Sequence, residues 1–213
     1  MMICKNKLRK AHYDKYKCRL RDGFTHHCKT VAKEGQIVFF GDSITEMLSV
    51  SDWYGDYCAK SGLEAYNRGI GGDTTLGLYR RMRENVLCIK PKAVVILIGT
   101  NDLQFEFTPD FIAMNMENIL KLFKEECPDC KVILEAVYPV IEGRAGRRKN
   151  KDILEVNRKY KALAEKYGAD FVDLTGLLAD DRGNLREDCT YDGLHLSAKG
   201  YEVTTREIAK LLP

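Results

Sequence analysis

The feature that most constrains the fold is a regular alternation of short apolar runs with longer amphipathic stretches. Residues 93–98 read Ala-Val-Val-Ile-Leu-Ile and are apolar at every position, as expected for a strand buried on both faces of a parallel sheet. Four shorter strand candidates lie at residues 37–40, 65–67, 132–137 and 171–172. Strands that alternate with helical segments predict an α/β domain, in which helices cover both faces of a parallel sheet.

Between the strand candidates, apolar residues recur at the three- and four-residue spacing of helices. The stripes are Thr75, Tyr79, Met82 and Val86, then Ile112, Met116, Ile119 and Phe123, then Ile153, Val156, Tyr160, Leu163 and Tyr167. Thr108 followed by Pro109 predicts the start of a helix, and Gly168 predicts the end of another. We interpret each stripe as the core-facing side of a helix.

Charge separates the first 35 residues from the rest of the chain. Residues 1–35 hold ten Lys and Arg against three Asp and Glu, whereas residues 36–213 hold 24 against 28. We therefore divide the chain into a basic N-terminal arm, helical or irregular, and one domain over residues 36–213. A basic arm can contact nucleic acid, an anionic membrane or an acidic partner. It has little of the Gly/Arg or aromatic-basic interleaving of nucleic-acid binders, so we favour a solvated helix packed on the domain and no nucleic-acid partner.

The sequence indicates a cytoplasmic protein without stable membrane insertion. The N-terminus has no apolar core of a signal peptide, and no stretch approaches the roughly 18 apolar residues that span a bilayer. Eight cysteines at irregular spacings are typical of free thiols in a reducing compartment. The sequence leaves a homo-oligomer open.

Two sets of cysteines and histidines have alternative interpretations that we disfavour. Cys127 and Cys130 have redox spacing, but they follow a predicted helix and precede a strand, the reverse of the thioredoxin order. Cysteines and histidines of the N-terminal arm could bind a metal, but no pair among them has zinc-finger spacing. These residues are Cys4, Cys18, His26, His27 and Cys28.

Polar residues follow three of the predicted strands directly. Gly-Asp-Ser ends at Ser43, the glycine-rich segment 67–75 contains Gly72, and Gly-Thr-Asn-Asp contains Asn101. Asp-Gly-Leu-His at residues 192–195 precedes the final helix. In doubly wound sheets the carboxyl ends of the strands form the ligand-binding edge, so we expect these four segments to meet there.

Together these residues could perform acyl transfer. His195 is the only histidine after residue 27 and lies three residues after Asp192, which could orient it as the general base for the Ser43 hydroxyl. The N–H groups of Ser43 and Gly72 and the amide of Asn101 could bind the tetrahedral oxyanion. The alternative is a surface histidine beside a solvated aspartate.

These segments resemble the four conserved blocks of the SGNH, or GDSL-type, hydrolase superfamily, in the family's order. The resemblance covers about residues 36–213. It implies a three-layer α/β/α flavodoxin-like fold with about five parallel strands in the order 2-1-3-4-5. It also implies ester or thioester hydrolysis without a metal or organic cofactor. Carried over, Ser43 is the nucleophile, His195 the base and Asp192 its orienter, and Ser43, Gly72 and Asn101 form the oxyanion hole.

Neighbouring residues have expected roles of their own. We expect Asp42 to bond to backbone at the strand turn, Asp102 to shape its loop, and Arg68 to form a salt bridge on the rim. Tyr138 either walls an acyl pocket or packs on the end of the sheet. The basic loop 142–151 is expected to overhang the active edge, where Arg144 would suit a carboxylate or phosphate.

We therefore expect a serine esterase for a small-molecule ester with a short acyl group, such as acetyl, on a polar or carbohydrate carrier. The alternative substrates are longer acyl chains, as in a lysophospholipase or thioesterase. A flavodoxin-like binding module is the non-catalytic alternative. Against nucleotide binding, the glycine segment lacks the G-x-G-x-x-G pattern because Thr74 occupies its last position.

Overall fold

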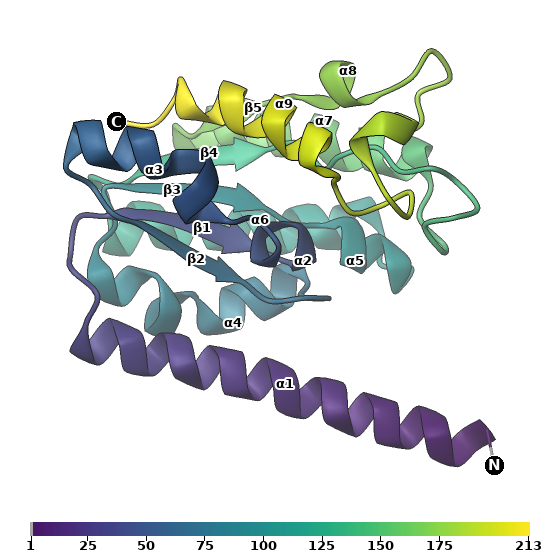
Figure 1. The fold of residues 1–213 in the computed structure, drawn as a ribbon, viewed down its shortest axis with the longest axis horizontal. Helices are drawn as coiled ribbons and strands as arrows, with labels where there is room; N and C mark the ends of the chain where they lie inside the picture. Colours follow the sequence, from purple (N-terminus) through teal and green to yellow (C-terminus); the bar gives the residue numbers. More distant parts are fainter. Residues whose placement is uncertain (1) are drawn as a thin grey trace.

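Five parallel strands form a single sheet in the order β2-β1-β3-β4-β5, which confirms the predicted fold (Figure 1). The computed structural model describes the backbone of residues 2–213 and the side chains of residues 14–213. The strands are β1 (Ile37–Gly41), β2 (Ala65–Gly69), β3 (Ala93–Leu97), β4 (Lys131–Glu135) and β5 (Asp170–Val172).

Helices connect the strands and cover the sheet. The α-helices are α1 (Met2–Thr30), α2 (Ser43–Glu46), α3 (Val50–Ser61), α4 (Thr75–Asn85), α5 (Thr100–Gln104), α6 (Pro109–Glu126), α7 (Asn150–Tyr167), α8 (Thr175–Leu178) and α9 (Ala198–Ala209). Two short 3₁₀ helices are η1 (Leu87–Ile89) and η2 (Glu187–Cys189). Among the residues described, no helix combines the length and apolar character needed to cross a membrane.

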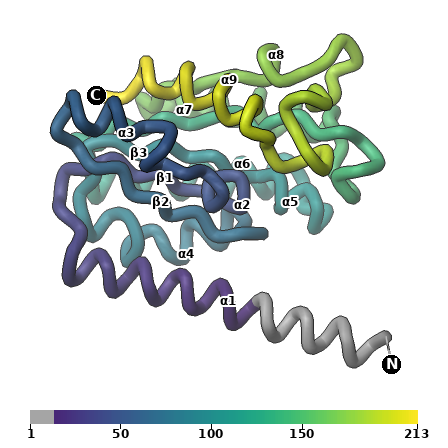
Figure 2. The backbone as a smooth tube through the Cα atoms, in the orientation of Figure 1, coloured from purple at the N-terminus to yellow at the C-terminus, as the bar shows by residue number. Residues whose placement is uncertain are grey.

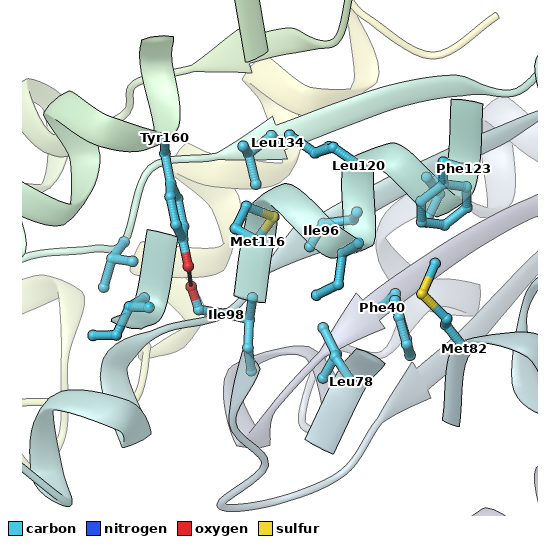
Figure 3. Close-up of a cluster of buried hydrophobic side chains, with 14 of the residues drawn as sticks. Phe40, Leu78, Met82, Ile96, Ile98, Met116, Leu120, Phe123, Leu134 and Tyr160 are labelled. Atoms are coloured by element: carbon cyan, nitrogen blue, oxygen red, sulfur yellow. Dashed lines mark hydrogen bonds between the residues drawn. The ribbon is translucent and has the colours of Figure 1, made fainter. Parts of the chain in front are cut away.

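Alternate residues of β1 face the two sides of the sheet, so each side has its own core. Val38 and Phe40 belong to a cluster with the apolar stripes of α4, α6 and α7, part of which is drawn in Figure 3. In that cluster the Tyr160 hydroxyl donates to the Ile98 carbonyl at 3.2 Å. Ile37 and Phe39 face the opposite cluster, which α3 and α9 cover.

The long helix α1 lies outside these layers and packs against α4 (Figure 1). Its half-buried side chains Phe24 and Cys28 lie four residues apart on one side, whereas Lys29 and most others are exposed. In the tube view the chain returns at its C-terminus to lie beside α3 (Figure 2), where the Tyr57 hydroxyl donates to the Pro213 carbonyl. The N-terminal segment is thus a helix attached to one outer layer.

The predicted helix signals are confirmed, while two strands end earlier than predicted, one of them (93–98) by a single residue at Leu97. Thr108 caps α6 by accepting from Phe111 N at 3.3 Å, and Gly168 ends α7 with φ of 74°. The predicted strand 132–137 ends at Glu135. Beyond it the Asn157 side chain binds the N–H and carbonyl of Val137 at 2.7 and 2.9 Å, replacing strand pairing.

Candidate active site

Four segments meet at the carboxyl ends of the strands, as the sequence predicts. Ser43 follows β1, and a Cβ placed on Gly71 after β2 would lie 3.8 Å from the Ser43 Cβ. Asn101 follows β3 and donates from Nδ2 to the Asp73 carbonyl at 3.0 Å. His195, in the loop before α9, reaches back to Ser43. Residues separated by up to 152 positions along the chain therefore share one site.

A continuous chain of contacts joins a serine, a histidine and an aspartate. Ser43 Oγ lies 2.9 Å from His195 Nε2, and His195 Nδ1 lies 2.6 Å from Asp192 Oδ2. Because a carboxylate only accepts hydrogen bonds, the neutral imidazole carries its proton on Nδ1. His195 Nε2 is then an acceptor facing the serine hydroxyl.

The Asp192 carboxylate is held by its own loop. Its Oδ1 accepts from the backbone N–H groups of Leu194 at 2.9 Å and His195 at 2.8 Å. Burial alone would raise the pKa of Asp192, but the hydrogen bonds from His195 and these N–H groups hold it below its usual value. The carboxylate therefore stays ionised beside the imidazole at neutral pH.

Ser43 is fixed by the tight turn between β1 and α2. Gly41 is required there because a Cβ would collide with Thr45 Oγ1 and the Leu97 carbonyl. The buried Asp42 caps α2, since its Oδ1 accepts from Ile44 N at 3.0 Å. Burial raises the pKa of Asp42 to about 7. This arrangement confirms the structural role expected for Asp42.

The glycine loop after β2 contains Gly72 in the left-handed region, with φ of 63°, where residues other than glycine are strained. Among the residues described, nothing accepts from the Gly72 N–H. The Gly72 carbonyl accepts from Lys17 Nζ of α1 at 2.7 Å. The neighbouring Gly71 N–H donates to the Glu46 carboxylate, which also accepts from the Tyr16 hydroxyl of α1. Helix α1 therefore contacts the loop that carries an expected oxyanion donor.

A buried ion pair holds the same loop from the other side. Arg81 of α4 donates from Nε to Asp73 Oδ2 at 2.7 Å and from Nη2 to the Gly41 carbonyl at 3.0 Å. It thereby links the glycine loop to the turn that precedes Ser43. We did not predict this residue from the sequence. Arg81 lies about one helical turn after the buried Leu78, beside the apolar stripe that we identified, and a charge at such a position requires a buried partner.

The amide of Asn101 is bonded at both ends. Its Nδ2 donates to the Asp73 carbonyl at 3.0 Å and makes a longer contact of 3.3 Å with Asp42 Oδ2. Its Oδ1 accepts from Arg148 Nη2 at 2.8 Å. Arg148 belongs to the basic loop 142–151, yet it is only 6% exposed. We did not predict this contact from the sequence.

Asp102 joins the loop after β3 to the start of α4, in agreement with the loop-shaping role that we expected. Its carboxylate accepts from the Thr75 N–H at 3.0 Å and from the Thr75 hydroxyl at 2.6 Å. These bonds fix the start of α4 against the loop after β3. Burial raises the pKa of Asp102 to about 6, although the bonds from Thr75 oppose that shift.

Tyr138 does not wall an open pocket. It is 4% exposed, packs in the core cluster beneath α3 and α9, and its hydroxyl donates to Glu135. Of our two interpretations, packing on the end of the sheet is the one observed. An apolar ring with a buried hydroxyl partner is more stable in the core than in solvent.

Arg144 lies beside the loop that carries the aspartate and histidine. A Cβ on Gly193 would lie 2.9 Å from the Arg144 Cβ, and Ile141 N donates to the Gly193 carbonyl at 2.8 Å. The Arg144 guanidinium is half exposed and pairs with Glu187 at 2.7 Å. A role in substrate binding stays a prediction.

The expectation of a rim salt bridge for Arg68 is wrong. Arg68 is 4% exposed and donates from Nε to the Asn85 carbonyl at 3.2 Å, while its Nη2 lies 3.0 Å from His27 Nδ1. Its guanidinium also lies over the rings of Phe24 and Tyr66. Arg68 is buried because α1 covers it, a contact that spacing along the sequence does not reveal.

The cysteine and histidine sets show no metal geometry within the described part of the chain, and the side chain of Cys4 lies outside the described residues. Burial raises the pKa values of the Cys127 and Cys130 thiols, which lowers their reactivity. No redox role is therefore supported for the pair.

Comparisons with known proteins place the chain in a family of related sequences and structures. Residues 39–203 match the model of the GDSL-like Lipase/Acylhydrolase family. The chain is 32% identical over 184 residues to platelet-activating factor acetylhydrolase IB subunit alpha1 of Bos taurus, covering 84% of this chain and 76% of that protein. A solved Streptococcus pneumoniae protein is 26% identical and superposes with a TM-score of 0.91 over 99% of both chains. A GDSL-like lipase of Bacteroides thetaiotaomicron, also 26% identical, gives 0.76 over 90% of this chain and 96% of its own.

Proposed function

Because the chain belongs to the GDSL-like lipase/acylhydrolase family and is an ester-bond hydrolase, we propose that Ser43, His195 and Asp192 are its catalytic triad. The observation that carries this proposal is the unbroken chain of contacts from Ser43 Oγ through both imidazole nitrogens to Asp192 Oδ2, at 2.9 and 2.6 Å. This geometry suits nucleophilic catalysis by a serine.

In the acylation step, the Ser43 hydroxyl attacks the ester carbonyl carbon while its proton moves to His195 Nε2. The carbonyl oxygen becomes an oxyanion that accepts from the Ser43 N–H, the Gly72 N–H and Asn101 Nδ2. Asp192 stabilises the imidazolium and remains ionised. His195 then gives the proton to the leaving alcohol, whose bond to the acyl carbon breaks. A water activated by His195 hydrolyses the acyl-enzyme through the same states.

We propose a short acyl group, acetyl in the first instance, on a polar carrier. The Bos taurus relative is an acetylhydrolase by name. Arg144, beside the His195 loop, is the cation available to an anionic carrier.

One observation favours longer acyl chains as a second candidate. The Tyr191 ring stacks on the His195 imidazole with centroids 5.8 Å apart, and its hydroxyl lies 3.3 Å from Met47 Sδ. Tyr191 and Met47 are 59% and 50% exposed. Apolar surface next to the triad suits a lipid-like substituent.

A series of p-nitrophenyl esters from acetate to laurate tests the proposal, with Ser43→Ala as the inactive control. We expect kcat/KM to be highest for acetate and to fall as the chain lengthens. A value that rises with chain length would instead favour a lysophospholipase or thioesterase. The triad would be refuted if the wild type hydrolysed none of these esters, or if Ser43→Ala kept full activity.

A further inference from the structure

Arg148 is a buried cation whose partners are all neutral. Its Nε donates to the carbonyl and hydroxyl oxygens of Thr100 at 2.8 and 2.9 Å, and its Nη1 donates to Gln104 Oε1 at 3.0 Å and the Ala145 carbonyl at 2.9 Å. The remaining bond runs from Nη2 to Asn101 Oδ1 at 2.8 Å. Among the residues described, no carboxylate forms an ion pair with it.

A buried charge without a counter-ion is costly, so its location requires an explanation. Two carboxylates, Asp42 and Asp192, act on Arg148 at longer range and partly offset the burial that lowers its pKa. Both belong to the loops of the proposed active site. Arg148 thus lies within electrostatic reach of both loops.

The bond from Arg148 fixes which way the Asn101 amide points. A guanidinium has only donors, so the atom it contacts must be the amide oxygen. The amide nitrogen then faces the opposite way, toward the Asp73 carbonyl at 3.0 Å. The second N–H makes only the longer contact of 3.3 Å with Asp42 Oδ2, and an oxyanion would accept from this N–H by displacing that weaker contact.

We propose that Arg148 is a positioning residue of the oxyanion hole that acts through Asn101. By binding Asn101 Oδ1 it sets the orientation of the amide before substrate arrives. Its positive charge also polarises the amide, because withdrawing electron density at Oδ1 makes the Nδ2–H groups stronger donors. This inference rests on the proposed function, since it assigns a role within that site.

Kinetics with p-nitrophenyl acetate test the proposal in two variants. Arg148→Met removes the charge and all five bonds, whereas Arg148→Lys keeps the charge. We expect Arg148→Met to lower kcat by about 10- to 100-fold, because loss of an orienting residue should cost no more than loss of an oxyanion-hole donor itself. Arg148→Lys should lower kcat by less. KM should change less than about twofold. Thermal unfolding of each variant shows that folded protein is being compared.

A double-mutant cycle separates positioning from a general structural role. Because Arg148 acts through Asn101, Arg148→Lys should change kcat by less than about twofold in an Asn101→Ala background. Arg148→Met, whose expected loss is the larger, should likewise change kcat by less than about twofold beside Asn101→Ala, and a loss of 10-fold or more there would overturn the proposal. Arg147→Lys is the matched control, since Arg147 is exposed and pairs with Glu106, and should behave as wild type.

The outcomes distinguish this proposal from the proposed function. If Ser43→Ala removes hydrolysis but both Arg148 variants keep the wild-type kcat, only the role of Arg148 falls. If the Arg148 variants unfold at the assay temperature, the cycle is measured with Gln104→Ala, which removes one partner of Arg148 Nη1. Gln104→Ala should lower kcat slightly when it is introduced into the wild-type enzyme, and it should not lower kcat further when it is introduced into Asn101→Ala. An equal fractional loss of kcat in the two backgrounds would refute the proposal.

Discussion

The triad side of the site and its oxyanion side are held in different ways. On the triad side, Ser43, His195 and Asp192 contact one another directly, and Asp192 is anchored by N–H groups of its own loop. On the oxyanion side, no hydrogen bond within the described part of the chain joins the expected donors Gly72 and Asn101, and cations from distant segments hold them.

Three cations share that task, and none belongs to a motif. Lys17 comes from α1, Arg81 from α4 and Arg148 from the loop before α7. Preorganised donors are effective because they need not reorient as charge develops. The proposed reactive groups therefore lie within short local motifs, whereas the rigidity of the proposed oxyanion hole depends on contacts with the rest of the fold.

The largest expected effects on kcat come from replacing one side chain on the triad side and one on the oxyanion side. His195→Ala should lower kcat by roughly 10⁴- to 10⁶-fold because Ser43 loses its base. Asn101→Ala should lower it by about 10²- to 10³-fold because one donor is lost. Steady-state kinetics with p-nitrophenyl acetate measure both values. Equal losses in the two variants would break the distinction between the sides.

A smaller effect is expected at the contact between α1 and the glycine loop. Lys17→Met removes the donor to the Gly72 carbonyl, which should let the loop shift and lower kcat by about 3- to 10-fold with little change in KM. Lys15→Met is the matched control because Lys15 is an exposed lysine on the same turn of α1. Similar kinetics for the two variants would show that α1 does not influence the loop.

Little effect on turnover is expected at Glu135, which belongs to neither side. Burial raises its pKa to about 7, against the hydrogen bond from Tyr138. The folded state therefore holds this proton more tightly than the unfolded state, and wild-type stability should fall as pH rises from about 4.5 through about 7.

Glu135→Gln should remove that loss. Relative to wild type, the variant should gain on the order of 2–3 kcal/mol of unfolding free energy between pH 4.5 and pH 8. Urea denaturation at several pH values measures the gain, and kcat at pH 6 should match wild type. A difference between the two proteins that does not vary with pH would show that Glu135 does not titrate in this range.

The sequence was sufficient to predict the fold and the meeting of the three side chains that we propose as the triad. Short strands such as residues 93–98 and polar residues directly after strands are local signals, and the parallel topology brings those strand ends together. Ser43 and His195 were therefore predictable even though 152 positions separate them.

The supporting contacts could not be predicted because they have no local signal in the sequence. Arg148 lies in an irregular basic loop with no periodicity that would indicate burial, and Lys17 shares its helix with many exposed cations. Arg68 and Tyr138 were misplaced or left undecided because their burial depends on how α1 and α9 pack, which is a property of the assembled layers. Arg81 is the exception, because a charged residue about one helical turn after Leu78 indicates a buried ion pair.

The most direct test of the account is to trap the acyl-enzyme. The wild type is mixed with p-nitrophenyl acetate, quenched in acid during turnover, digested and analysed by mass spectrometry. The account predicts one acetyl group on the peptide that contains Ser43 and none in Ser43→Ala. Turnover accompanied by an acetyl group on a different residue, or by an acetylated Ser43 peptide that forms more slowly than product, would contradict it.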